Sequence, residues 1–349
     1  MTDTGLVPPD GLRRYLDETF GPSEAALEVS RLGEGHSNLT FLVRRGDDEY
    51  VLRRPPRGDI QPGTHEMHRE YTVMDAIASN GMPVPVPRPV ALCRDEVYIG
   101  APFYLMSLVD GIVVRGAVPD AFDAPEHRRA MGLELVDRLA DIHSLDWLAI
   151  GLSSLARKPE GFLERNLRRM QQLYDAVRHR EVPEIDEAGA WLREHAPSQR
   201  DVTLTHGDYK LDNVMFGPQA PPRIVAVVDW EIATIGDPLV DLGWMLYFSP
   251  EPGDPEMQSV AGEVSREPGY PSRSELAQRY AQRTGRPIDD LRFYAAMAGW
   301  KIAIIMEGSN MRHKQGDADD PMFEMLDAGV PALAAKSLSI IRGELEVGV

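Results

Sequence analysis

The stretch THGDYKLDN, residues 205–213, places acidic, basic and amide side chains within nine positions. Asp208 precedes Asn213 by five residues, and Asp229 ends a second apolar run sixteen residues further on. Phosphoryl transfer from ATP needs a carboxylate that orients and deprotonates the attacking hydroxyl, and oxygen ligands for the Mg²⁺ that bridges the phosphates. Either segment alone would fit a polar turn or a strand-end cap. Together, in this order, they favour a phosphoryl-transfer site.

Short strands are expected to hold these residues, because the apolar run VTLT leads into THGDYKLDN and the apolar run RIVAVVD ends with Asp229. Further upstream, residues 27–54 have the alternating pattern of strands, with a turn expected at GDD, 46–48. Residues 64–81 have apolar side chains at helical spacing, and residues 103–107 are again strand-like. Helical patterns dominate from about residue 111. The sequence therefore predicts an α+β fold with a β-rich N-terminal lobe (1–106), a hinge (107–110) and a helical C-terminal lobe (111–349).

The composition limits the partners. The 349 residues carry a net charge of −18, which disfavours binding to nucleic acid or to anionic membranes. The one cysteine, Cys93, permits no intrachain disulfide and fits a reducing compartment. Neither a signal peptide nor an apolar run of membrane-spanning length is visible, so we expect a cytoplasmic location.

The segments LTHGDYKLDNVMF, RIVAVVDWE and IGDPLVDLGWML together resemble the aminoglycoside phosphotransferase family of small-molecule kinases. The resemblance runs from about Val29 to Arg342. It is strongest toward the kinase-like domains that occur alone or fused to acyl-CoA dehydrogenases. It implies a bilobal protein-kinase-like fold, ATP and Mg²⁺ as cofactors, a small hydroxylated acceptor, and a functional link to an acyl-CoA dehydrogenase.

The resemblance assigns roles in the catalytic segment. Asp208 corresponds to the catalytic base, and Asn213 and Asp229 correspond to the Mg²⁺ ligands. His206 corresponds to a residue that supports the loop by hydrogen bonding. Glu231 fits either an auxiliary metal ligand or a solvated turn.

In the N-terminal lobe, LGEGHSNLTFLV resembles the loop that covers the nucleotide phosphates. As a pattern it is weak, because two glycines between strands usually mark only a hairpin. The residues that the resemblance places near the triphosphate are Gly33, Gly35, His36, Ser37 and Asn38.

The strand YVLRR departs from the family pattern, because the first 157 residues contain no lysine. Arg53 takes the position of the phosphate-binding lysine, and Glu70 that of its ion-pair partner. Strand alternation puts Arg53 on the side of Val51 and Arg54 on the opposite side. Lys210 fits either a cation facing the transferred phosphoryl group or a solvated loop charge.

Two further segments carry expectations. Extended backbone from Ser107 to Val109 would bind the adenine edge, with Met106 beside the ring; a buried edge strand is the alternative. In GDPLVDLGW, Asp237 followed by Pro238 is expected to cap a helix, and the resemblance implies that Asp241 hydrogen-bonds the catalytic-loop backbone.

The acceptor stays open at this level. A basic group in the C-terminal region suits an anionic acceptor such as a hydroxy acid or a hydroxyacyl-CoA, although an ordinary charged helix face would look the same; its members are Lys301, Arg312, His313 and Lys314. An aminoglycoside kinase and a non-catalytic nucleotide-binding module are the alternatives. The Pro- and Gly-rich segment 249–276 fits either a lid or a surface loop.

Overall fold

The computed structural model of the protein describes residues 3–33, 38–56, 67–156, 158, 160–255, 263–316 and 321–348. Its N-terminal part is built on a five-stranded antiparallel sheet in the order β1-β2-β3-β5-β4. The strands are β1 (Leu27–Arg31), β2 (Leu39–Arg45), β3 (Asp48–Arg54), β4 (Pro89–Cys93) and β5 (Phe103–Ser107). The expected turn between β2 and β3 is present, and Gly46 supplies its positive φ of 62°.

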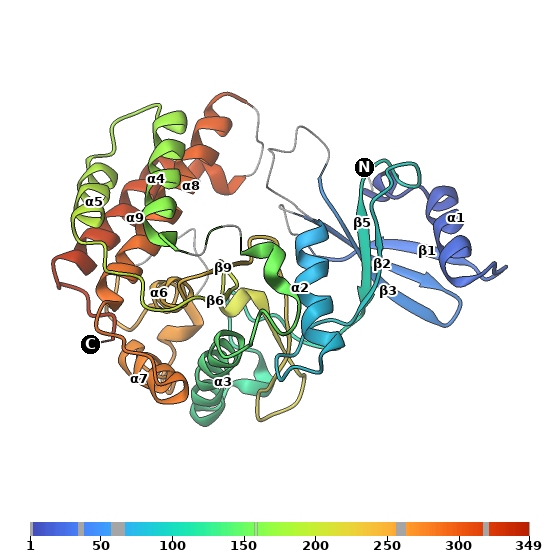
Figure 1. Cartoon of the computed structure of the whole chain (residues 1–349), viewed down its shortest axis with the longest axis horizontal. Helices are drawn as coiled ribbons and strands as arrows, with labels where there is room; N and C mark the ends of the chain where they lie inside the picture. The colour runs from blue at the N-terminus through green and yellow to red at the C-terminus, as the bar shows by residue number, and fades with distance from the viewer. Residues whose placement is uncertain are drawn as a thin grey trace.

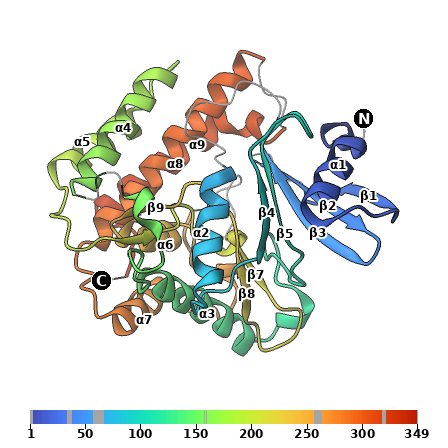
Figure 2. The ribbon, with the colours of Figure 1, turned by 45° about the vertical axis from the view of Figure 1, so that its right-hand side comes forward.

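The two faces of this sheet belong to different cores. Helix α1 (Pro9–Phe20) covers the outer face, where Leu52 lies in a cluster with residues of α1. Helix α2 (Met67–Ser79) lies on the other face, between the sheet and the helical lobe (Figures 1 and 2). Val51, on that face, belongs to the large core that continues into the helical lobe. Alternation along β3 therefore assigns successive residues to separate cores.

The C-terminal lobe is helical around two small two-stranded antiparallel sheets, which pair β6 with β9 and β7 with β8. These strands are β6 (Thr203–Thr205), β7 (Val214–Phe216), β8 (Ile224–Val227) and β9 (Thr234–Gly236). The helices are α3 (Pro125–His143), α4 (Phe162–Val177), α5 (Pro183–Glu194), α6 (Leu239–Tyr247), α7 (Arg273–Thr284), α8 (Leu291–Lys314) and α9 (Leu326–Ile341). The predicted α+β fold with two lobes is confirmed. The lobe limits at residues 106 and 111 stay a prediction.

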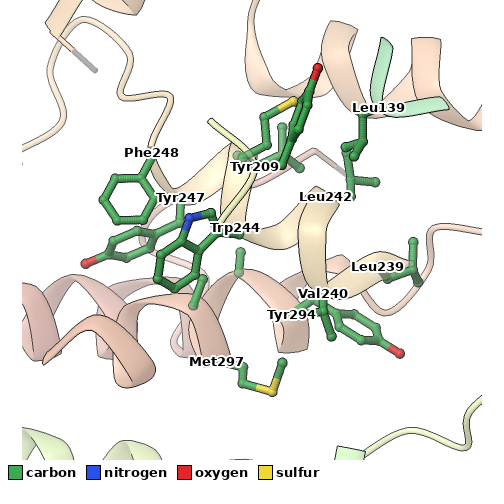
Figure 3. Close-up of a cluster of buried hydrophobic side chains, with 14 of the residues drawn as sticks. Leu139, Tyr209, Leu239, Val240, Leu242, Trp244, Tyr247, Phe248, Tyr294 and Met297 are labelled. Atoms are coloured by element: carbon green, nitrogen blue, oxygen red, sulfur yellow. The ribbon is translucent and has the colours of Figure 1, made fainter. Parts of the chain in front are cut away.

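Helix α6 is the centre of the helical lobe and packs along α8. At Gly243 the two backbones touch, since an added Cβ would lie 2.5 Å from the carbonyl carbon of Tyr294. The apolar side chains of α6 point to opposite sides: Leu242 lies beside Leu139 of α3, and Trp244 lies beside Phe248 (Figure 3). This packing fixes α6 rigidly behind the loop that joins β6 to β7.

In the described part of the chain, none of the helices combines the length and the apolar character needed to cross a membrane.

Candidate functional site

The loop between β6 and β7 is held from behind by the buried carboxylate of Asp241 on α6. Its Oδ2 accepts a hydrogen bond from His206 N at 2.6 Å, and its Oδ1 accepts one from Gly207 N at 2.8 Å. His143 of α3 contacts Oδ2 through Nε2 at 3.2 Å. Burial pushes the pKa of Asp241 up, but the hydrogen bonds outweigh burial and leave that pKa below its ordinary value. The expected bond between Asp241 and the loop backbone is therefore present.

His206 ties the same loop to the end of β8. Its Nε2 donates to Val228 O at 2.9 Å, and its Nδ1 accepts from Asp208 N at 3.3 Å. Both ring nitrogens are used by the backbone, as a loop-supporting role requires. Gly207 has a φ of 89°, and an added Cβ would lie 3.0 Å from Ile232 O, so the loop admits only glycine there.

The carboxylate of Asp208 is fixed by three donors. Lys210 Nζ and Asn213 Nδ2 donate to Oδ2 at 2.7 and 2.8 Å, and Trp244 Nε1 donates to Oδ1 at 2.8 Å. The side chain of Asp208 is 27% exposed, so it can still meet a small molecule. Nothing in the sequence singles out Trp244 as a hydrogen-bond donor to Asp208. The only clue was that a buried indole N–H usually finds a partner.

Asp229 lies two residues past the end of β8 and has a φ of 69°, which is unusual for a residue other than glycine. Val228 N donates to Asn213 O at 3.0 Å, so the residue before Asp229 is bonded directly to Asn213. Asp229 Oδ1 accepts from Arg53 Nη2 of β3 at 3.2 Å. The structure thus links Asp208 to Asn213, and the end of β8 to Asn213.

The expected ion pair between Arg53 and Glu70 is present. Arg53 Nη1 lies 2.5 Å from Glu70 Oε1, and both side chains are buried. Burial raises the pKa of Glu70, with Asp229 and Glu231 adding to the rise and Arg53 opposing it. Arg53 therefore bridges two carboxylates, one on α2 and one from the helical lobe.

Arg54 points to the other face, as alternation predicts. Its Nη1 donates to Leu6 O and, at 3.2 Å, to Ile99 O, while Nε donates to Pro55 O at 3.1 Å. This side chain ties the chain start and the loop before β5 to the sheet, away from the site.

The expected phosphate-covering loop is only partly described. Gly33 has a φ of 76°, whereas Gly35, His36 and Ser37 lie outside the described residues. Asn38 is buried, and its Nδ2 donates to Glu231 Oε2 at 2.7 Å. An N-lobe residue predicted to lie near phosphates thus contacts the carboxylate two positions after Asp229.

The hinge differs in part from the expectation. Ser107 N donates to Arg88 O at 2.9 Å, and Ser107 Oγ accepts from Arg88 N at 2.9 Å. An adenine could therefore bind the Ser107 amide only if this pair broke. Val109, which is half-buried beyond the end of β5, is the remaining predicted backbone contact. Met106 is buried in register with Val51, on the side of β5 that faces the shared core.

The predicted basic group does not stay together. Lys314 forms an ion pair with Asp327 at 2.5 Å, and Arg312 donates to Ser309 Oγ at 3.3 Å. Lys301 precedes Arg312 by eleven residues on α8, which separates the two by roughly 16 Å along the helix axis. It lies instead with its Nζ 5.2 Å from the centre of the Trp244 ring.

The described parts of segment 249–276 are anchored to the helical lobe. Arg273 Nη1 lies 2.5 Å from Asp254 Oδ2, and Arg273 Nη2 lies 3.3 Å from Glu251 Oε2. Ser265 Oγ donates to Pro250 O at 2.6 Å. The lid and the surface loop both stay predictions.

Hard oxygen donors suited to Mg²⁺ are present at the site. Because Asn213 Nδ2 donates to Asp208, its amide oxygen is the atom left for a cation, and Asp229 Oδ2 is the carboxylate oxygen not used by Arg53. Mg²⁺ commonly takes one or two such protein ligands and completes its shell with water and phosphate oxygens. Over the described ranges, no group of three or more His, Cys, Asp or Glu side chains forms a separate metal cluster.

The chain is similar to known proteins over most of its length. A model of the phosphotransferase enzyme family matches residues 28–276. Acyl-CoA dehydrogenase family member 10 of Mus musculus is 33% identical over 319 residues, covering 90% of this chain and 29% of that protein. Family member 11 of Gallus gallus is 34% identical over 325 residues, covering 90% of this chain and 40% of that protein. The chain thus spans less than half the length of these curated relatives.

Solved structures agree with this assignment. A Ralstonia eutropha protein assigned by its description to the aminoglycoside phosphotransferases is 32% identical, with a TM-score of 0.79 and coverage of 98% of this chain and 99% of that one. The GDP and kanamycin complex of APH(2")-IIia shares the fold, at a TM-score of 0.60 and 16% identity, with coverage of 93% and 97%. This chain belongs to the phosphotransferase enzyme family, and its enzyme class is that of the small-molecule kinases.

Proposed function

We propose that the protein transfers the γ-phosphoryl group of ATP to a hydroxyl of a small molecule, with Asp208 as the base. The observation that carries this proposal is the carboxylate of Asp208, which is oriented by Trp244, Lys210 and Asn213 and is still partly exposed. Because the side chain is already held in one orientation, little conformational entropy is lost when the acceptor binds.

In this mechanism the acceptor hydroxyl lies against Asp208. As its oxygen bonds to the γ-phosphorus, the bond from phosphorus to the bridging oxygen of ADP breaks, and the hydroxyl proton passes to Asp208. Lys210 is hydrogen-bonded to the same carboxylate, and its positive charge lies near the transferred phosphoryl group, where it stabilises developing negative charge. Asn213 and Asp229 would hold Mg²⁺, which supplies charge neutralisation for the phosphates.

Arg53 replaces the usual lysine at the nucleotide. Its guanidinium is held between Glu70 and Asp229, and its fork of donors can bind carboxylate and phosphate oxygens together. This arrangement supports an active kinase over a non-catalytic nucleotide-binding module. That alternative rests only on the missing lysine, and a buried cation occupies the matching position.

The acceptor is proposed to be a hydroxy acid or a hydroxyacyl-CoA. The relatives named acyl-CoA dehydrogenase family members support this class and a functional link to such a dehydrogenase. An aminoglycoside is the second candidate, supported by the description of the Ralstonia eutropha protein. Measuring ADP release with hydroxy acids, hydroxyacyl-CoA thioesters and aminoglycosides would separate the two.

Asp208→Asn tests the catalytic assignment. We expect turnover to fall by at least about 100-fold, because general-base catalysis contributes about 10²- to 10⁴-fold. ATP binding in the presence of Mg²⁺, measured by calorimetry, should stay close to that of the wild type. Asp212→Asn, in the same loop, is the matched loss of one carboxylate and should keep most of the activity. Retention of more than about a tenth of the wild-type rate by Asp208→Asn would remove Asp208 as the base.

A further inference from the structure

A lysine lies one aromatic ring away from the proposed base. Lys301 Nζ on α8 lies 5.2 Å from the centre of the Trp244 ring, and Trp244 Nε1 donates to Asp208 Oδ1 at 2.8 Å. Trp244 itself is only 5% exposed and packs against Phe248, with ring centres 4.9 Å apart. The indole is therefore fixed, and it sets the spacing between the ammonium group and the carboxylate.

Lys301 differs from three other lysines of the described chain. Lys210 and Lys314 are paired with carboxylates, and Lys336 Nζ donates to Tyr247 O at 2.9 Å. Within the described ranges, Lys301 Nζ has the Trp244 ring as its contact and forms neither a hydrogen bond nor an ion pair. A cation–π contact recovers only part of the solvation that a half-buried ammonium group loses. The site therefore has capacity for an anion.

Charged groups of both signs lie around Lys301. Burial lowers the pKa of Lys301, and Arg169 of α4 lowers it further, while Asp241 and Asp208 oppose the shift. Both of these carboxylates already accept hydrogen bonds from other donors. An anion that reached Lys301 would meet an ammonium group without an ion-pair partner among the described residues, with Arg169 as a second cation and with Asp241 and Asp208 as the opposing charges.

We propose that Lys301 binds an anionic group of the acceptor, a carboxylate or a phosphate, while the acceptor hydroxyl lies at Asp208. This inference rests on the proposed function and adds to it the place where the acceptor's charge is bound. It predicts an acceptor whose anion lies a few bonds from its hydroxyl, since one indole separates Lys301 from Asp208. It disfavours polycationic sugars.

The test measures binding of two matched pairs of probes with ADP and Mg²⁺ at saturation. The pairs are 3-hydroxybutyrate with its uncharged methyl ester, and glycerol 3-phosphate with glycerol; ligand-observed NMR gives the Kd. We expect the wild type to bind at least one anion about tenfold or more tightly than its neutral partner, because a hydrogen bond to a charged group is of that strength. The pair that shows the preference distinguishes a carboxylate from a phosphate.

Lys301→Met should abolish the preference and leave the neutral probe unaffected, whereas Lys301→Arg should retain most of it. Lys314→Met, which removes a paired lysine from the same helix, is the control and should keep it. Should Lys301→Met fold poorly, acetylation of the wild type gives the same answer: the preferred anion should protect Lys301 and not Lys314. The inference is overturned by a wild type that binds both members of each pair equally, or by a preference that survives Lys301→Met.

The outcome is separable from that of the proposed function. Phosphoryl transfer to neutral acceptors, with no preference for an anion, would leave the kinase assignment intact and overturn the role of Lys301. A Lys301-dependent preference in a protein that transfers phosphate to none of the acceptors would instead contradict the proposed function.

Discussion

Arg53→Met removes the cation from a buried ion pair and leaves its partner in place. Glu70 is 1% exposed, Arg53 is 7% exposed, and their closest atoms are 2.5 Å apart. Among the described residues, the second carboxylate oxygen of Glu70 has no hydrogen-bond partner. Loss of one member of such a pair typically costs about 3–5 kcal/mol. That is a large part of the roughly 5–15 kcal/mol by which domains are stable.

A second substitution separates stability from activity. Arg53→Met combined with Glu70→Leu replaces both charges with apolar side chains, and such replacements are often neutral or stabilising. We therefore expect the double variant to regain most of the unfolding free energy. Its kcat should stay low, because the proposed contact between Arg53 and the nucleotide phosphates is still absent.

Urea unfolding of the wild type, the single variant and the double variant measures the stability effect, and steady-state kinetics measure the activity. A single variant that loses less than about 1 kcal/mol would show that the pair is as weak as an exposed one. A double variant with wild-type kcat would show that the phosphates are held without a cation from β3. That result would shift the role to Lys210.

Two other substitutions have expected outcomes. Arg54→Ala should lower the unfolding free energy by about 2–4 kcal/mol without changing kcat, because it removes charged donors from Leu6 O and Ile99 O; denaturation and kinetics together check this, and a lowered kcat in a stable protein would contradict it. Burial lowers the pKa of Lys336 from 10.5 to about 8. The buried ammonium group therefore destabilises the folded state to its full extent below pH 8, and this destabilisation disappears as the pH rises toward 10.5. The wild type should therefore gain about 3 kcal/mol relative to Lys336→Met between those pH values, and a constant difference in unfolding free energy would refute the reasoning.

A local strand pattern and the family resemblance together predicted several contacts of the site. Alternation along YVLRR placed Arg53 and Arg54 on opposite sides, and the family resemblance predicted the pair with Glu70. The same resemblance predicted that Asp241 would bond the loop backbone. Only the first of these features follows from neighbouring residues; the other two join separate elements, 17 and 35 positions apart, and were predictable because the resemblance covers both partners.

Other features depend on how distant elements pack, which local patterns do not record. Trp244 reaches Asp208 because α6 lies directly behind the loop, with Gly243 pressed on α8. Lys301 joins this site and not the basic residues further along its own helix. The bond between Asn38 and Glu231 spans the two lobes, across 193 positions of the sequence.

The double-sided N-terminal sheet has a consequence for how the lobe can open. Side chains at positions 51 and 53 face the core or the site shared with the helical lobe, whereas those at 52 and 54 face the cluster under α1. Transient detachment of α1 would therefore uncover Leu52 and Arg54 while Val51 and Arg53 stayed covered by α2. Cooperative units of this kind open with separate free energies. Consecutive residues of β3 thus belong to motions that need not occur together, and detachment of α1 would leave the side chains on the face of Arg53 in place.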